Sequence, residues 1–185
     1  MSKQLTVEQR DFRAAMSNLS AAVNVVTTNG PSGRAGITVS AVCSVTDAPP
    51  TMIVCVNQAS YTHEIFRRNQ RVCVNILSAS DEELAGHFAG TTGIPMQDRF
   101  SWPIWDHDTE DIPMLRTAAA RVVGRIVGDY TQGSHSIFMV SASRVDVREN
   151  TGALVYFRRR FHSIGLDERS QPEQENIGWT TRTIA

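Results

Sequence analysis

The sequence contains no apolar run close to the ~20 residues that a membrane-spanning helix requires, and its first residues, MSKQLTVEQRDFRAAM, lack the apolar core of a secretory signal. It has only three cysteines, Cys43, Cys55 and Cys73, an odd number with no CxxC spacing. Each cysteine stands in an apolar run, which predicts reduced, buried thiols rather than disulfides. These absences predict a cytoplasmic protein that does not enter a membrane.

An excess of one charge is also missing. The 18 Lys and Arg residues nearly balance the 19 Asp and Glu residues, for a formal net charge of -1, so nothing favours nucleic acid as a partner. No GxGxxG run follows a strand and opens a helix, and there is no Walker loop, HExxH or GxSxG. The histidines have no metal-ligand spacing, which predicts no metal site and makes a metal-dependent hydrolase a poor alternative; they are His63, His87, His107, His135 and His162.

Short β-branched runs dominate what is present. Strands are predicted over residues 22–28, 35–45, 51–56, 71–77, 119–127, 137–147 and 153–157. Helices are predicted after capping boxes at Thr6/Gln9 and Ser80/Glu83, and over residues 60–69. Many strands with few helices predict a mainly β barrel with peripheral helices. One domain is expected over residues 1–165, and residues 166–185 are expected to form a polar tail or partner-bound extension.

Small hydroxyl residues gather in the segment GITVSAVCSVT, residues 36–46. If this strand is regular, Thr38, Ser40, Ser44 and Thr46 share one face. A barrel strand whose polar face meets water explains the pattern and is favoured by it alone. A wall of hydroxyls facing a polar, planar ligand is the functional alternative.

Three further features have a structural and a functional interpretation. Ser60-Tyr61-Thr62 begins a helix after a buried strand, where free N–H groups suit a phosphate, although N-capping by Ser60 explains it equally well. His135 follows a glycine turn and is typical of a solvated turn residue. The run Arg158–Arg160 is typical of a solvated or salt-bridged edge.

The order of these segments resembles the flavin reductase-like, FMN-binding split-barrel family. The matching pieces cover about residues 10 to 163 and are FRAAMSNLSAAVNVVTT, GITVSAVCSVTDAPPTMIVCVN, VCVNIL, HFAG, GSHSIF and YFRRRFH. The pieces AVCSVTDAPP and YFRRRFH are more narrowly similar to the reductases that serve 4-hydroxyphenylacetate 3-monooxygenases, although reductases of pyrimidine degradation share the CSVTD stretch. The implied fold is a Greek-key split β-barrel with a few peripheral helices.

The resemblance also implies a set of binding residues. The flavin would contact the strand at Thr38, Val39, Ser40 and Ala41, the stretch Cys43, Ser44, Val45 and Thr46, the helix start Ser60, Tyr61 and Thr62, and the segment Phe88, Ala89 and Gly90. His135, Phe161 and His162 would lie on the NADH side. No side chain is implied as a catalytic acid or base, because hydride transfer is carried by the cofactors.

The implied activity is NADH-dependent reduction of FMN or FAD, with NADPH as an alternative donor. The reduced flavin would diffuse to a partner monooxygenase, and the family habit is a homodimer. A non-catalytic flavin- or haem-binding split barrel, acting as a carrier or redox sensor, is the alternative from a different class.

Overall fold

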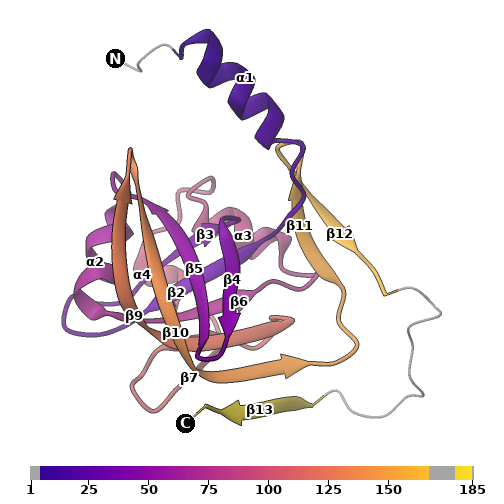
Figure 1. The fold of residues 1–185 in the computed structure, drawn as a ribbon. Coiled ribbons are helices and arrows are strands. Elements are labelled where there is room, and N and C mark those ends of the chain that lie inside the picture. The colour runs from indigo at the N-terminus through magenta and orange to yellow at the C-terminus, as the bar shows by residue number, and fades with distance from the viewer. Residues whose placement is uncertain (1–4, 167–177, 185) are drawn as a thin grey trace.

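The computed structural model describes residues 5–166 and 178–184. An eight-stranded antiparallel sheet forms the centre of the fold, in the order β3-β2-β6-β9-β10-β5-β4, with β13 also paired to β10 (Figure 1). Its strands are β2 (Asn24–Thr28), β3 (Ala35–Val39), β4 (Val42–Asp47), β5 (Pro50–Asn57), β6 (Arg71–Ile76), β9 (Ala120–Gln132), β10 (His135–Arg148) and β13 (Trp179–Thr183). The mainly β fold predicted from the sequence is confirmed.

The sheet curls into a barrel because side chains from most of its strands meet in one apolar core. Val26, Val54, Val74 and Phe138, from β2, β5, β6 and β10, are all buried in it. Phe66 of helix α2 (Tyr61–Asn69) joins this core. Burial of these side chains is the main force that closes the sheet.

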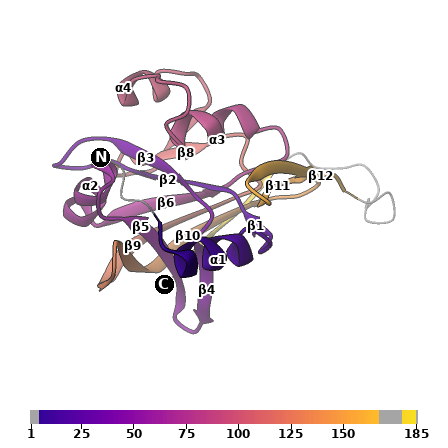
Figure 2. The ribbon, with the colours of Figure 1, turned by 90° about the horizontal axis from the view of Figure 1, so that it is seen from above.

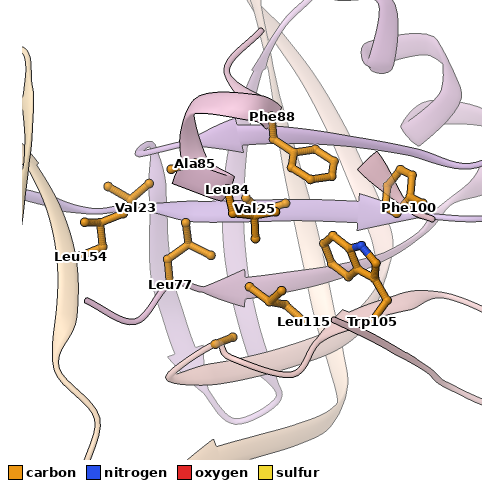
Figure 3. Packing of buried hydrophobic residues seen from close by; sticks show 11 residues of the cluster. Val23, Val25, Leu77, Leu84, Ala85, Phe88, Phe100, Trp105, Leu115 and Leu154 are labelled. Carbon is orange, nitrogen blue, oxygen red and sulfur yellow. The ribbon is translucent and has the colours of Figure 1, made fainter. Parts of the chain in front are cut away.

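A second apolar cluster lies outside the barrel, between β2 and the segment that follows β6 (Figure 3). Helix α3 (Glu82–Phe88) contributes Ala85 and Phe88 to it. The segment 90–115 contains helix α4 (Met96–Arg99) and the strands β7 (Trp105–His107) and β8 (Pro113–Leu115). Strand β2 is therefore buried on both faces, which explains why all five of its residues are inaccessible.

Helix α1 (Val7–Met16) and a small sheet lie beside the barrel (Figures 1 and 2). The predicted capping box is confirmed, since Thr6 accepts a hydrogen bond from the Gln9 N–H and Gln9 accepts one from the Thr6 N–H. The small sheet has the order β1-β11-β12, with β1 (Ala21–Ala22), β11 (Ala153–Phe157) and β12 (Arg160–Ile164). Helix α1 buries none of its side chains.

Three predictions made from the sequence are wrong. Residues 35–45 do not form one strand, because the chain leaves the sheet at Ser40–Ala41 and β3 and β4 take places at opposite ends of the strand order. As a result Cys43 is exposed on β4, while Cys55 is half-buried and Cys73 is buried as expected. Helix α3 begins after Asp81, not Ser80, and has no side-chain cap.

Most of the predicted tail, residues 167–177 and 185, lies outside the described residues. The described part contains β13, which pairs with residues 144–148 of β10, so this part of the predicted polar tail is a strand of the central sheet. No helix among the described residues is long and apolar enough to cross a membrane.

Candidate functional site

A groove on the outside of the barrel brings together most of the predicted flavin residues. It consists of two cavities of about 310 and 370 Å³ that share Thr38 and Ala89. The predicted residues that line it are Thr38, Ser40, Ser60, Tyr61, Thr62, Phe88, Ala89, Gly90 and Phe161. They come from β3, α2, α3 and β12, so the groove exists only in the folded chain.

One end of the groove is the N-terminus of helix α2. Ser60 caps this helix, accepting from the Thr62 N–H at 3.4 Å, and the two hydroxyl oxygens lie 2.8 Å apart. The free N–H groups and the partial positive charge of a helix start suit an anion. The helix start predicted at Ser60, with Ser60 as its N-cap, is confirmed.

Arg99 adds a full positive charge at the same end. Its guanidinium donates to the Ile94 carbonyl and lies over the Phe88 ring at 5.6 Å, and the side chain is almost entirely buried. Burial lowers the pKa of Arg99, yet a guanidinium keeps its proton in a protein. A helix start and a fixed cation together form a site suited to a phosphate group.

The middle of the groove is held by contacts between β3 and α3. The Thr38 hydroxyl donates to the Ala85 carbonyl at 2.7 Å. Phe88 packs edge-on against Phe100 and Trp105, with ring centroids 5.3 and 5.7 Å away (Figure 3). A Cβ atom on Gly36 would come within 2.6 Å of the Phe88 ring, so this close approach requires glycine.

The other end of the groove is the hairpin of β11 and β12. Tyr156 and Phe161 line it with ring centroids 5.4 Å apart, and Arg159 of the turn and Arg160, the first residue of β12, line it as well. The hydroxyl-bearing residues Ser40 and Thr91 lie in the same cavity. This end therefore combines aromatic surface, hydroxyls and positive charge.

The remaining predicted residues do not line the groove. Val39 belongs to the barrel core, and Ala41, Cys43, Ser44, Val45 and Thr46 fall at or after the break between β3 and β4 and are not buried. His135 is exposed at the start of β10, with its Nδ1 2.9 Å from the Ser134 hydroxyl. His162 lies on β12 with its Nε2 3.2 Å from the Phe157 carbonyl oxygen.

Sequence reasoning missed the arginines of the groove. Arg99 gave no signal, because it stands in a segment without periodic pattern. The run Arg158–Arg160 was noted but interpreted as a solvated or salt-bridged edge. The three residues are exposed, yet in the part of the chain that the structure describes none of them forms a salt bridge.

Metal ligands are absent from the groove. Over residues 5–166 and 178–184 the structure shows no group of three or more His, Cys, Asp or Glu side chains that could hold a metal ion. His63 instead contacts the Ser136 hydroxyl at 2.8 Å and stacks on Phe138.

The hydroxyl-lined groove extends from a helix N-terminus to an aromatic hairpin, and its chemistry suits a planar ligand with a phosphate group. The chain belongs to the flavin reductase-like family, since the sequence model of the flavin reductase like domain matches residues 16–165. The resemblance identified from the sequence is thereby confirmed.

Individual relatives agree with this membership. The chain is 46% identical over 167 residues to the 4-hydroxyphenylacetate 3-monooxygenase reductase component of Pseudomonas aeruginosa, covering 90% of this chain and 98% of that one. It is 44% identical over 161 residues to an NADH-dependent FMN reductase of Serratia proteamaculans, covering 85% and 89%. The solved flavin reductase component of a bacterial two-component tryptophan halogenase superposes with a TM-score of 0.80 at 26% identity, covering 85% of this chain and 99% of that chain.

Proposed function

We propose that the protein is an NADH:flavin oxidoreductase that supplies reduced FMN or FAD to a partner aromatic monooxygenase, with 4-hydroxyphenylacetate as the partner's substrate. The observation that carries this proposal is the continuous groove from Ser60 to Phe161 in a chain of the flavin reductase-like family. The relative from Pseudomonas aeruginosa supports the choice of partner.

The residues of the groove fit a flavin. The start of α2 and Arg99 would hold its phosphate, as both offer positive charge and N–H donors at one place. Thr38 and Ser40 would face the polar edge of the ring system, and Ala89 and Gly90 would border it. The predicted contacts of residues 43–46, His135 and His162 remain predictions.

The bound flavin supplies the redox chemistry by accepting a hydride from NADH. The task of the chain is to orient the two ring systems, because a hydride passes only when the reacting atoms lie about 3–3.5 Å apart. N–H donors of the groove would stabilise negative charge on a bound flavin without a titrating acid. We therefore expect no single side chain of the groove to act as an acid or base.

Release of the reduced flavin is favoured by the openness of the groove. Tyr61, Ala89 and Gly90 are exposed, and no residue of the described chain covers them. An exposed groove buries less of a ligand than a closed pocket and binds it less tightly. This suits an enzyme whose product must leave to reach an oxygenase.

We further propose that the protein forms a homodimer. Helix α1 and the residue after its C-terminal turn expose an apolar set, which consists of Val7, Phe12, Met16 and Leu19. Exposed apolar side chains at helical spacing favour contact with a second surface. Light scattering of the purified protein measures the oligomeric state.

The experiment that tests the proposed activity is NADH oxidation followed at 340 nm with FMN, with FAD and without flavin. We expect turnover that rises with free flavin and needs no aromatic compound. Repeating the assay with NADPH ranks the two donors. Flavin that stays bound through gel filtration, with no oxidation of either donor, would instead support the non-catalytic flavin carrier.

A further inference from the structure

The hairpin turn at the mouth of the groove has an unfavourable backbone for its residues. Phe157 pairs with Arg160, so Arg158 and Arg159 alone form the turn between β11 and β12. Both have positive φ, 47° and 63°. Two-residue turns of this kind favour Asn-Gly, because a Cβ atom is strained in the left-handed region.

The three guanidinium groups of the turn have different surroundings. Arg158 is anchored: its N–H donates to the Ser17 carbonyl at 2.7 Å and its Nε to Asn18 Oδ1 at 3.1 Å. Arg159 and Arg160 line the cavity of about 370 Å³ and make neither an ion pair nor a side-chain hydrogen bond within residues 5–166 and 178–184. Two arginines without an ion pair among the described residues therefore line the same cavity.

Backbone strain that persists without a compensating contact tends to occur at functional sites. Here the strain places Arg159 beside the cavity, next to the aromatic rings of Tyr156 and Phe161. Aromatic surface, a hydroxyl and two guanidinium groups match the parts of a dinucleotide, namely its rings, its riboses and its pyrophosphate.

We infer that Arg159 and Arg160 bind the pyrophosphate of the nicotinamide dinucleotide. This inference rests on the proposed function, in which the phosphate of the flavin occupies the opposite end of the groove at the start of α2. The second reactant must then approach from the hairpin end. At this turn position arginine supplies a positive charge that Asn or Gly would not supply.

The variant Arg159→Gly tests the inference because it separates binding from stability. If Arg159 served only to stabilise the turn, its replacement would lower the melting temperature. Glycine relaxes the turn, so the melting temperature should equal that of the wild type or rise by about 2 °C. The KM for NADH should rise at least about fivefold, as expected for a charged contact, while the Kd for FMN should stay unchanged. Arg159→Lys keeps the charge and should recover most of the affinity for NADH.

Calorimetric binding of ADP-ribose gives a readout that does not depend on turnover. ADP-ribose carries the pyrophosphate without the nicotinamide, and adenosine lacks both. Arg159→Gly should weaken ADP-ribose binding at least about fivefold and leave adenosine binding unchanged. Arg125→Gln is the matched control, since Arg125 is an exposed arginine of β9 that does not line the groove.

The outcomes separate this inference from the proposed function. Unchanged NADH and ADP-ribose affinities in an active Arg159→Gly enzyme would overturn the inference and leave the reductase intact. A loss of FMN affinity with an unchanged KM for NADH would also overturn it, because the arginines would then serve the flavin phosphate. Weakened ADP-ribose binding in a protein that oxidises no nicotinamide would uphold the anion site and refute the reductase.

Discussion

Two groups of arginines on the same barrel differ in their burial and in their carboxylate partners. Arg121 and Arg144 both donate to Asp146, at 2.7–3.0 Å, and Arg121 and Asp146 are almost completely buried. Arg159 and Arg160 are exposed on the hairpin turn and have no carboxylate partner among the described residues. We call these the buried cluster and the turn pair.

The difference shows how the surroundings of an arginine indicate its role. A buried guanidinium requires a paired negative charge, so breaking the buried cluster should destabilise the barrel. An exposed, unpaired guanidinium keeps its hydration, so it carries no desolvation penalty and stays available for an anion. The following predictions test whether stability and binding separate between the two groups.

The largest effect is expected from Asp146→Ala. The substitution removes two of the hydrogen bonds of the buried Arg121 and leaves it only Asp106 as a carboxylate partner, at 2.9 Å. The loss should be about 3 kcal/mol of unfolding free energy in urea titration, the lower end of the range for a broken buried pair. Asp129→Ala is the matched control, because Asp129 forms an exposed pair with Arg67 and should cost less than about 1 kcal/mol. Equal losses in the two variants would mean that the buried cluster does not stabilise the fold.

Low pH should lower the stability of the fold through the carboxylate of the same buried cluster. Burial raises the pKa of Asp146, but hydrogen bonds from Arg144 and Thr181 and the charges of Arg121 and Arg144 outweigh it, so the pKa is lowered overall. The ionised carboxylate therefore stabilises the fold above the unfolded-state value of about 3.9. This contribution is lost as the pH falls through the lower folded-state pKa.

Thermal melts between neutral and strongly acid pH measure this loss. We expect a flat melting temperature down to about pH 4 and a fall below it, steeper in the wild type than in Asp146→Asn. An equally steep acid fall in Asp146→Asn would assign the loss to other carboxylates.

Removal of Trp179 should have an intermediate effect. The centre of its ring lies 3.8 Å from the Arg121 guanidinium carbon, and the side chain packs against the second apolar cluster, the one outside the barrel. Trp179→Ala should cost about 2–3 kcal/mol, from a cation–π contact of about 1–2 kcal/mol and lost apolar burial. Trp179→Phe should retain most of the stability, and a loss as large as that of Trp179→Ala would argue against the ring contact.

The smallest effect is expected from salt. Screening acts on exposed charges far more than on buried ones. Raising KCl from about 0.05 to about 0.5 M should increase the KM for NADH about two- to fivefold through the turn pair and leave the melting temperature nearly constant. In Arg159→Gly the salt dependence of KM should be weaker, and an unchanged slope would separate the turn pair from NADH binding.

The fold class was predictable because it depends on short-range patterns. Alternating apolar residues predicted most strands, and the Thr6 capping box and the Ser60 helix start are confirmed. The break at Ser40–Ala41 was not predictable, because the hydroxyl alternation runs through it without interruption. It separates β3 from β4 through long-range pairing, β3 with β2 and β4 with β5.

Part of the groove was predictable for the same reason. Ser60 and Thr62 follow from helix capping, Thr38 and Ser40 were singled out by the hydroxyl alternation, and the other residues came from the family resemblance. Arg99, Arg159 and Arg160 were missed, because only tertiary contacts decide whether an arginine is paired, buried or turned toward a cavity. The buried position of Arg121 was likewise invisible, since it depends on Asp146 across the β9–β10 pairing.

The central claim, that the groove is the flavin site, is tested most directly by filling it at the point where its two cavities meet. Ala89 is exposed there and lines both cavities, so Ala89→Trp should block the groove without disturbing the core. Ala14→Trp, on the exposed helix α1, is the matched control. Flavin fluorescence titrations should show at least about tenfold weaker FMN and FAD binding for Ala89→Trp, and wild-type binding for Ala14→Trp. Wild-type flavin affinity in a folded Ala89→Trp protein would contradict the account and place the flavin elsewhere on the barrel.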